Sequence, residues 1–285
     1  MASNISFISK TPSKCPVCET EFYEEKLQTG RGRLIAGELT GELRRMYEPS
    51  KKYGEVSPLI YSIAVCPECY YSVYPQDFNE IGPDTKAELE AETDKRKSSI
   101  ALIFSDLDFR GPREWKEGIA SYYFSLMCYD HFPKEFSPTV KRGVSAIRAA
   151  WLLSDHHRKY PNDNYDYMAK LFYRKARFYY IMAVEFEGNG KETIAGMDML
   201  GPDTDKNYGY DGVLFLSAYL DYNYGPHKNS EMREKALIRA KTTLARIFGM
   251  GKASKNKPSS ILELAKDLHG KISSDMKTSG DEEED

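Results

Sequence analysis

The chain has 285 residues, and its 40 Lys and Arg side chains against 43 Asp and Glu side chains give a formal net charge of −3 at pH 7. This near-neutral balance excludes a global positive field that would attract nucleic acid or an anionic membrane. Hydrophobic residues make up 41% of the chain, enough for a sizeable core, yet no apolar run reaches the roughly 18–20 residues of a membrane span.

Residues 1–14 are polar and are expected to be disordered. They lack the apolar segment of a secretory signal, and cysteines spaced for a metal suit a reducing compartment. We therefore expect a cytoplasmic protein without a membrane contact.

Two Cys-Pro-x-Cys pairs are the most specific motif of the chain. Two residues between the cysteines let one tight turn direct both sulfurs to a single ion. Four thiolates form a closed tetrahedral site that leaves no position for water or substrate, so the motif predicts one structural Zn²⁺ ion. An iron ion on the same sulfurs and two redox-active dithiol pairs are the alternatives. The predicted ligands are Cys15, Cys18, Cys66 and Cys69.

The segment between the pairs, residues 19–65, mixes cations with glutamates. Its cations could contact phosphates of a nucleic acid, but the glutamates favour a solvated loop or a clamp onto the rest of the protein. Residues 59–65 are β-prone and predict a strand that delivers Cys66, and residues 70–74 predict an extended segment after the second pair. The cations considered are Arg31, Arg33, Arg44, Arg45, Lys51 and Lys52.

From residue 79 onward, apolar residues recur at spacings of three and four, which indicates helices. Short Gly- and Pro-containing breaks separate them, and the chain ends in an acidic run that predicts disorder. We expect a four-cysteine module over residues 15–78, a helical domain over 79–275 and a disordered tail over 276–285. The predicted helices cover residues 86–104, 115–126, 138–154, 165–186, 211–224, 230–248 and 259–272.

Consecutive helices with short connections favour an array of helical hairpins. Ala176, Tyr180 and Ala183 have the Ala-x3-aromatic-x2-Ala spacing of tetratricopeptide repeats. The predicted fold class is therefore mainly α, a tetratricopeptide-like helical-hairpin array with a small β-containing four-cysteine zinc module. An irregular helical bundle is the alternative.

Cys128, the fifth cysteine, lies in an aromatic-rich segment three residues before His131. Unpaired cysteine is among the residue types most often buried, so we expect a core side chain and no nucleophile. His156 and His157 are adjacent and point to different faces of a helix, which argues against a second metal site. Phosphate loops, dinucleotide motifs and nucleophile elbows are absent from the sequence, so nothing indicates an enzyme.

Tyrosine occurs 21 times. These rings either fill packing positions or line a concave groove that binds a protein partner, as helical arrays do. The tyrosines expected to form the groove wall are Tyr208, Tyr210, Tyr219, Tyr222 and Tyr224.

Several segments resemble DUF2225, a bacterial family of unknown function. They are Cys15–Phe22, Arg31–Leu34, Pro58–Tyr61, Val65–Tyr71 and Ala149–Leu153.

The resemblance covers residues 15 to about 250 and is specific in the cysteine module. It implies a zinc-bound cytoplasmic bacterial protein with a tetratricopeptide-like helical region and no established enzymatic activity. The sequence departs from the family at Glu19 and Tyr70, where glycine is usual because the backbone turns with positive φ.

We therefore expect a non-enzymatic, zinc-stabilised scaffold that binds a protein partner through its helical domain. A nucleic-acid-binding zinc-ribbon protein that uses the basic insert is the second hypothesis, and an enzyme of unknown reaction is the third.

Overall fold

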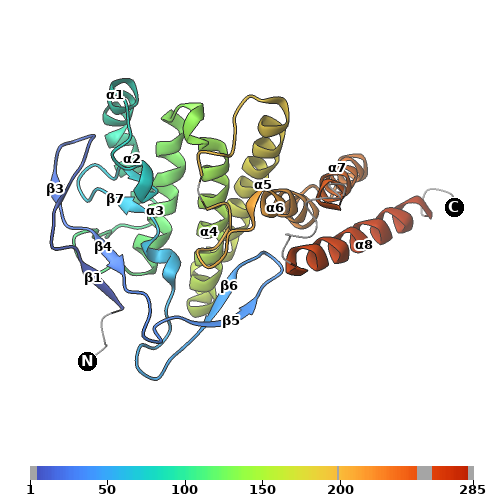
Figure 1. The fold of residues 1–285 in the computed structure, drawn as a ribbon, viewed down its shortest axis with the longest axis horizontal. Coiled ribbons are helices and arrows are strands. Elements are labelled where there is room, and N and C mark those ends of the chain that lie inside the picture. Colours follow the sequence, from blue (N-terminus) through green and yellow to red (C-terminus); the bar gives the residue numbers. More distant parts are fainter. Residues whose placement is uncertain (1–4, 198, 249–258, 282–285) are drawn as a thin grey trace.

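The computed structural model describes residues 5–197, 199–248 and 259–281. Short antiparallel strand pairs occupy the N-terminal part, and α-helices occupy the rest (Figure 1). The expected mainly helical class with a small β-containing four-cysteine module is thus confirmed. Among the described helices, none combines the length and the apolar character needed to cross a bilayer.

Within the described ranges, the strands form four separate two-stranded antiparallel sheets, which pair β1 with β4, β2 with β3, β5 with β6 and β7 with β8. The turn between β2 and β3 holds the first cysteine pair, and the turn between β7 and β8 holds the second. Each pair is thus presented at the tip of a hairpin. The strands are β1 Ser6–Ile8, β2 Ser13–Lys14, β3 Glu21–Phe22, β4 Glu25–Leu27, β5 Ile35–Leu39, β6 Arg45–Glu48, β7 Ala64–Val65 and β8 Ser72–Val73.

The prediction of disorder through residue 14 is wrong for the described residues, because β1 and β2 lie within it. Phe7 and Ile8 are 46% and 44% exposed, so burial does not order β1. Ladder hydrogen bonds to β4 and a bond from Ser6 Oγ to Glu25 hold it instead. Residues 1–4 lie outside the described part.

The strand predicted over residues 59–65 is also largely wrong. A 3₁₀ turn, Pro58–Tyr61, occupies its first half, and only Ala64–Val65 is a strand. Pro58 causes the difference, because its fixed φ and missing amide hydrogen suit the first position of a helical turn.

The helices follow the predicted order with two differences. The segment expected as one helix bends at Glu92 into α1 and α2, and α8 continues through residues 276–281, where the sequence predicts the tail to begin. Residues 249–258 and 282–285 lie outside the described part. The helices are α1 Pro83–Ala91, α2 Thr93–Ala101, α3 Trp115–Cys128, α4 Pro138–Lys159, α5 Tyr165–Asn189, α6 Gly209–Tyr224, α7 Ser230–Phe248 and α8 Ser259–Asp281.

From α3 to α8, each helix packs against the next one along the chain (Figure 1). Close approach between α4 and α5 depends on Gly143, where an added Cβ would lie 3.1 Å from the ring of Tyr180. Ala146, Ala176 and Ala183 are buried in the same region. This sequential packing fits a helical-hairpin array, and the assignment to tetratricopeptide repeats stays a prediction.

A buried ion pair joins the cysteine module to the helices. Lys141 of α4 is fully buried, and its Nζ lies 2.6 Å from Oδ2 of Asp77, which follows β8. Tyr129, directly after α3, donates its hydroxyl to the same carboxylate oxygen at 2.5 Å. Tyr71 packs in the same hydrophobic core as Tyr122. The module and the helical region therefore share one core.

Replacing Asp77 by Asn removes the carboxylate charge beside the buried ammonium of Lys141. Because breaking a buried pair on one side leaves a charge uncompensated, we expect a loss of about 3–5 kcal/mol in urea denaturation. The double variant Asp77→Asn/Lys141→Met should recover most of this loss. Asp166→Asn, at the exposed pair with Lys170, is the matched control and should change stability little. A wild-type midpoint for Asp77→Asn would contradict the proposed importance of the pair.

Candidate metal centre

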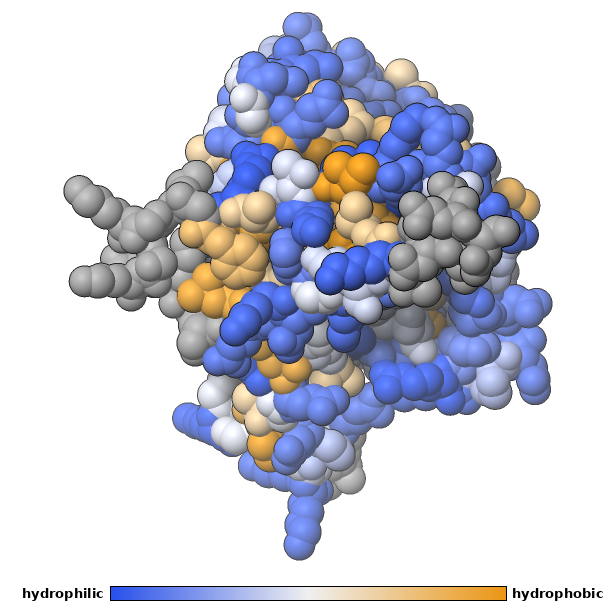
Figure 2. Space-filling view, turned by 90° about the vertical axis from the view of Figure 1, so that its right-hand side faces the viewer, coloured by the Kyte–Doolittle hydropathy of each residue, from blue (hydrophilic) through white to orange (hydrophobic). Residues whose placement is uncertain are grey.

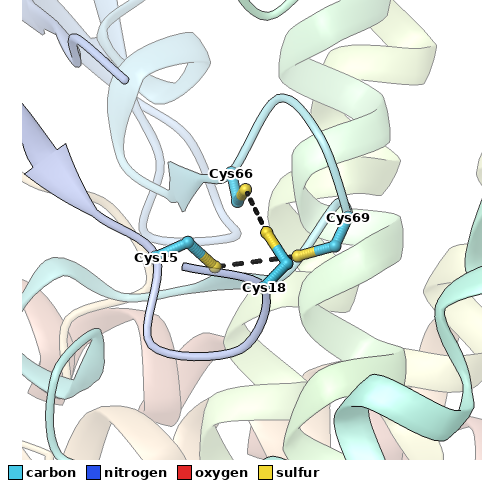
Figure 3. A group of neighbouring side chains, drawn as sticks. All are labelled: Cys15, Cys18, Cys66 and Cys69. Atoms are coloured by element: carbon cyan, nitrogen blue, oxygen red, sulfur yellow. Dashed lines mark hydrogen bonds between the residues drawn. The ribbon is translucent and has the colours of Figure 1, made fainter. Parts of the chain in front are cut away.

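The four predicted ligands converge on one point in the structure (Figure 3). Their sulfur atoms all lie within 4.8 Å of one another. The Sγ atoms of Cys15 and Cys69 are 3.7 Å apart, and those of Cys18 and Cys66 are 3.6 Å apart. Metal–sulfur bonds of about 2.3 Å in a tetrahedron place the sulfurs about 3.8 Å apart. The observed separations therefore fit a tetrahedral four-thiolate metal site.

Both cysteine turns have the same backbone geometry. The amide of Glu19 donates to the carbonyl of Cys15 at 2.9 Å, and the amide of Tyr70 donates to the carbonyl of Cys66 at 3.0 Å. Each turn then closes with a second bond, from the amide of its first cysteine to the carbonyl five residues later, at 2.9 Å in both. Two hairpins from distant parts of the sequence thus present sulfurs in the same way.

A residue with positive φ follows each cysteine pair, as the resemblance implies from the glycine that is usual at this position in the family. Glu19 has φ of 63° and Tyr70 has φ of 57°. The ring of Tyr70 stacks on Phe124 at 4.8 Å, which offsets the cost of its left-handed backbone. Glu19 makes surface ion pairs with Lys14 and Lys86.

Three of the four cysteine side chains are buried. Cys15 and Cys66 are fully buried, Cys69 is 2% exposed, and Cys18 is half-buried. Hydrogen bonds among the thiols shift their pKa values in opposite directions. The bond with Cys15 lowers the pKa of Cys66, whereas the bonds with Cys15 and Cys66 raise the pKa of Cys69. A divalent cation would relieve this competition, because all four sulfurs would then be thiolates.

Arg96 of α2 supports the second turn from the protein interior. Its side chain is 1% exposed, and its Nε donates to the carbonyl oxygen of Cys69 at 3.2 Å. The bend between α1 and α2 directs this arginine inward. It places a positive charge beside a cluster that carries a net charge of about −2 when four thiolates hold a divalent ion.

Cys128 does not belong to the cluster. Its sulfur accepts the backbone amide of Ser72 at 3.4 Å, and burial raises the pKa of this thiol to about 11. His131 contacts Glu88 and Glu92, at 2.9 and 3.1 Å, and does not activate Cys128. The expectation of a buried core cysteine is confirmed.

No second group of metal-ligating side chains gathers in the described ranges. Asp155 pairs with Arg44, and the ring of His156 packs against Tyr165 at 4.5 Å. His156 and His157 therefore belong to no such group among these residues.

Parts of the basic insert contact the helical region. Arg44 forms a two-point contact with Asp155 of α4, and Nε of Arg45 lies 2.9 Å from Asp205. These two arginines act as the clamp that the sequence offered as one alternative. Sequence analysis missed Glu42, whose carboxylate accepts hydrogen bonds from Trp151 and Tyr173. The Thr40-Gly41 turn between two β-prone segments was the signal for a hairpin here.

The candidate groove tyrosines all have contacts within the chain. Tyr208 is buried, and the others are half-buried. Tyr210 accepts a bond from Arg246 at 3.0 Å, and Tyr222 donates to Asp275 at 3.0 Å. The remaining contacts are Tyr219 beside Gly41 and Tyr224 stacked on Tyr173 at 4.1 Å.

Cys66→Ser should abolish binding of one metal ion per chain, because a hydroxyl is a poor substitute for a thiolate in a closed sulfur site. The measurement is elemental analysis of the purified variant after dialysis. Cys128→Ser is the matched control, since it changes a buried cysteine outside the cluster and should keep the metal. Equal metal content in both variants would contradict the assignment.

Glu19→Gly should raise the thermal midpoint by roughly 2–4 °C, because glycine adopts the left-handed backbone without strain. Glu21→Gly, two residues later in β3, should lower the midpoint, because an extended strand gains nothing from glycine. Calorimetry on metal-loaded protein measures both. A lower midpoint for Glu19→Gly than for Glu21→Gly would show that the Glu19 ion pairs outweigh backbone strain.

Comparison with known proteins agrees with the resemblance seen in the sequence. The family model described as "Uncharacterized protein conserved in bacteria (DUF2225)" matches residues 8–272. An uncharacterized protein of Borreliella burgdorferi (strain ATCC 35210 / DSM 4680 / CIP 102532 / B31) is 45% identical over 273 residues, which cover 96% of this chain and 98% of the relative. No solved structure matches the chain significantly. Because the family model spans most of the sequence, the chain belongs to the DUF2225 family.

Proposed function

We propose that the protein is a non-enzymatic scaffold that holds one structural zinc ion and docks a protein partner on its helical region. The observation that carries this proposal is the closed cluster of four sulfurs. A site of this kind leaves no coordination position for a substrate. When bound, the ion supplies a cross-link between two hairpins.

Ligand chemistry favours zinc over the alternatives. All four donors are thiolates, which suit zinc in a structural tetrahedral site, with iron as the competing ion. The short sulfur–sulfur distances run between the two turns, from Cys15 to Cys69 and from Cys18 to Cys66. That arrangement supports one shared ion over two separate dithiols. Neither pair lies at the start of a helix, where redox dithiols are usually found.

The helical region supports the docking part of the proposal. Successive helix pairs form extended surfaces that suit protein ligands. The end of the molecule with α7 and α8 carries mostly hydrophilic side chains with small separate hydrophobic groups (Figure 2), so we place the partner surface on the half-buried tyrosines. Tyr208 is too deeply buried to contribute, which leaves Tyr210, Tyr219, Tyr222 and Tyr224. The ion pairs of Arg44 and Arg45 weigh against nucleic acid as the partner.

Purified protein should contain about one zinc ion per chain, and Tyr222→Ala should weaken capture of a protein from the native cell. The reason is that aromatic anchors contribute most of the binding energy at interfaces. Tyr167→Ala, at a ring that is 61% exposed on α5, is the matched control.

Capture is measured by affinity purification at low and high salt, with circular dichroism as the folding check. Iron in place of zinc would contradict the metal assignment. Capture that vanishes at high salt and tracks the basic insert would favour the nucleic-acid hypothesis.

A further inference from the structure

The hairpin of β5 and β6 reaches from the cysteine module to the helical region, where its tip lies against α4, α5 and α6 (Figure 1). The turn at the tip is well defined. The amide of Leu43 donates to the carbonyl of Thr40 at 3.0 Å, and the amide of Arg44 donates to Thr40 Oγ1 at 3.2 Å. Leu43 has φ of 60°. The tip is thus a compact turn held in one shape.

The carboxylate of Glu42 binds side chains of α4 and α5. Trp151 of α4 donates its indole N–H to Glu42 Oε2, and Tyr173 of α5 donates its hydroxyl to the same oxygen at 3.0 Å. Burial raises the pKa of Glu42, while these donors favour its charged form. The side chains of Trp151 and Tyr173 therefore both bind the carboxylate of Glu42.

The next two residues of the tip, Leu43 and Arg44, make contacts of different kinds. Leu43 is fully buried, and its Cδ1 lies beside Gly212 of α6, where an added Cβ would be 3.9 Å away. Arg44 pairs with Asp155 and lies over the ring of Trp151 at 5.4 Å. The groove thus recognises an acidic, an apolar and a basic side chain in succession.

Outside its tip, the hairpin is largely exposed on β5, while β6 contacts the helical region through Arg45. β5 and β6 form a two-stranded sheet by themselves, and Ile35 is 39% exposed. An isolated two-stranded hairpin is marginal in water. Gly32 and Gly54, at the two ends of the segment, have positive φ and open space around them. Contacts of the tip and of Arg45 with the helical region therefore account for much of the order of the hairpin.

The groove continues beyond the tip into space that the hairpin leaves empty. A cavity of about 330 Å³ adjoins Tyr173 and Tyr224, and Ser154, His157 and Ala169 also line it. Tyr173 thus borders both the bound Glu42 and the cavity. A ligand that fills this cavity gains contacts that the hairpin does not make.

We propose that the groove of α4, α5 and α6 is a receptor for an acidic–apolar–basic turn, that Glu42–Arg44 occupies it in cis, and that a protein partner presenting the same chemistry competes with the hairpin. This inference rests on the proposed scaffold function and identifies the chemistry of the partner. The partner shifts the equilibrium only through contacts that the hairpin lacks, and the adjoining cavity offers them.

The probe is a fluorescent synthetic peptide of residues 35–48, cyclised to hold its turn, and the receptor is the full zinc-loaded chain. The variant Glu42→Ala/Leu43→Ser weakens the cis tip and should bind the peptide. Wild-type protein should bind it at least about tenfold more weakly, because a short tether gives the cis tip an effective concentration in the millimolar range. Fluorescence polarisation measures both affinities.

Two controls make the test specific. Glu38→Ala alters an exposed side chain of the same hairpin and should behave as wild type. Adding Tyr173→Phe to the weakened-tip variant removes the hydroxyl that binds Glu42 and should reduce peptide affinity at least about tenfold, since a hydrogen bond to a charged group is lost. If the double variant fails to fold, Glu42→Gln replaces it, because the amide keeps the size of the side chain and removes its charge.

Absence of peptide binding to a folded weakened-tip variant would overturn the proposal. The tip would then be a permanent structural contact with the helices. Equal binding to wild type and variant would also overturn it, because the peptide would then bind elsewhere. Either result leaves the scaffold function standing, since that function is tested separately by zinc content and by the effect of Tyr222→Ala on capture.

Discussion

The convergence of four sulfurs on one point is the constraint on which the N-terminal half of the structure depends. Two hairpins from distant parts of the sequence must meet, with both turns in the same left-handed geometry at Glu19 and Tyr70. The segment between them must therefore leave the site and return to it. This segment includes the hairpin of β5 and β6, and that hairpin brings the basic insert to the helices. The geometry of the cysteine cluster at one end thereby helps to position the contact between the β5–β6 hairpin and the helices at the other.

Buried charges connect this module to the helical region. Arg96 contacts the carbonyl of Cys69, and Lys141 pairs with Asp77. Arg148 of α4 is likewise buried and lies over the ring of Tyr74, 5.6 Å from its centroid. Such groups are costly to leave unpaired, so they disfavour any arrangement in which the module and the helices separate. The two predicted domains consequently form one core, in which the helical region packs against the module that holds the cysteine cluster.

The tyrosines illustrate how composition and geometry differ in what they reveal. Their number suggested an aromatic groove, and of the five tyrosines named for it only Tyr224 lines the cavity beside Tyr173. The sequence placed its wall mainly on α6, whereas α4 and α5 supply the side chains that bind Glu42. Tyr208, chosen from the sequence, is buried. Periodicity identifies a helix face, but only packing decides which face remains accessible.

The sequence by itself determined which four cysteines cluster, the helical class and, through the family resemblance, the positive φ after each cysteine pair. These features are local, because Cys-x2-Cys spacing, apolar periodicity and turn geometry involve residues within a few positions of one another. The tertiary structure alone decided the pairing of Arg44 with Asp155, the burial of Lys141 beside Asp77 and the docking of Glu42 on Trp151. Each of these contacts joins residues more than sixty positions apart, and no local pattern specifies which distant partner a buried charge will meet.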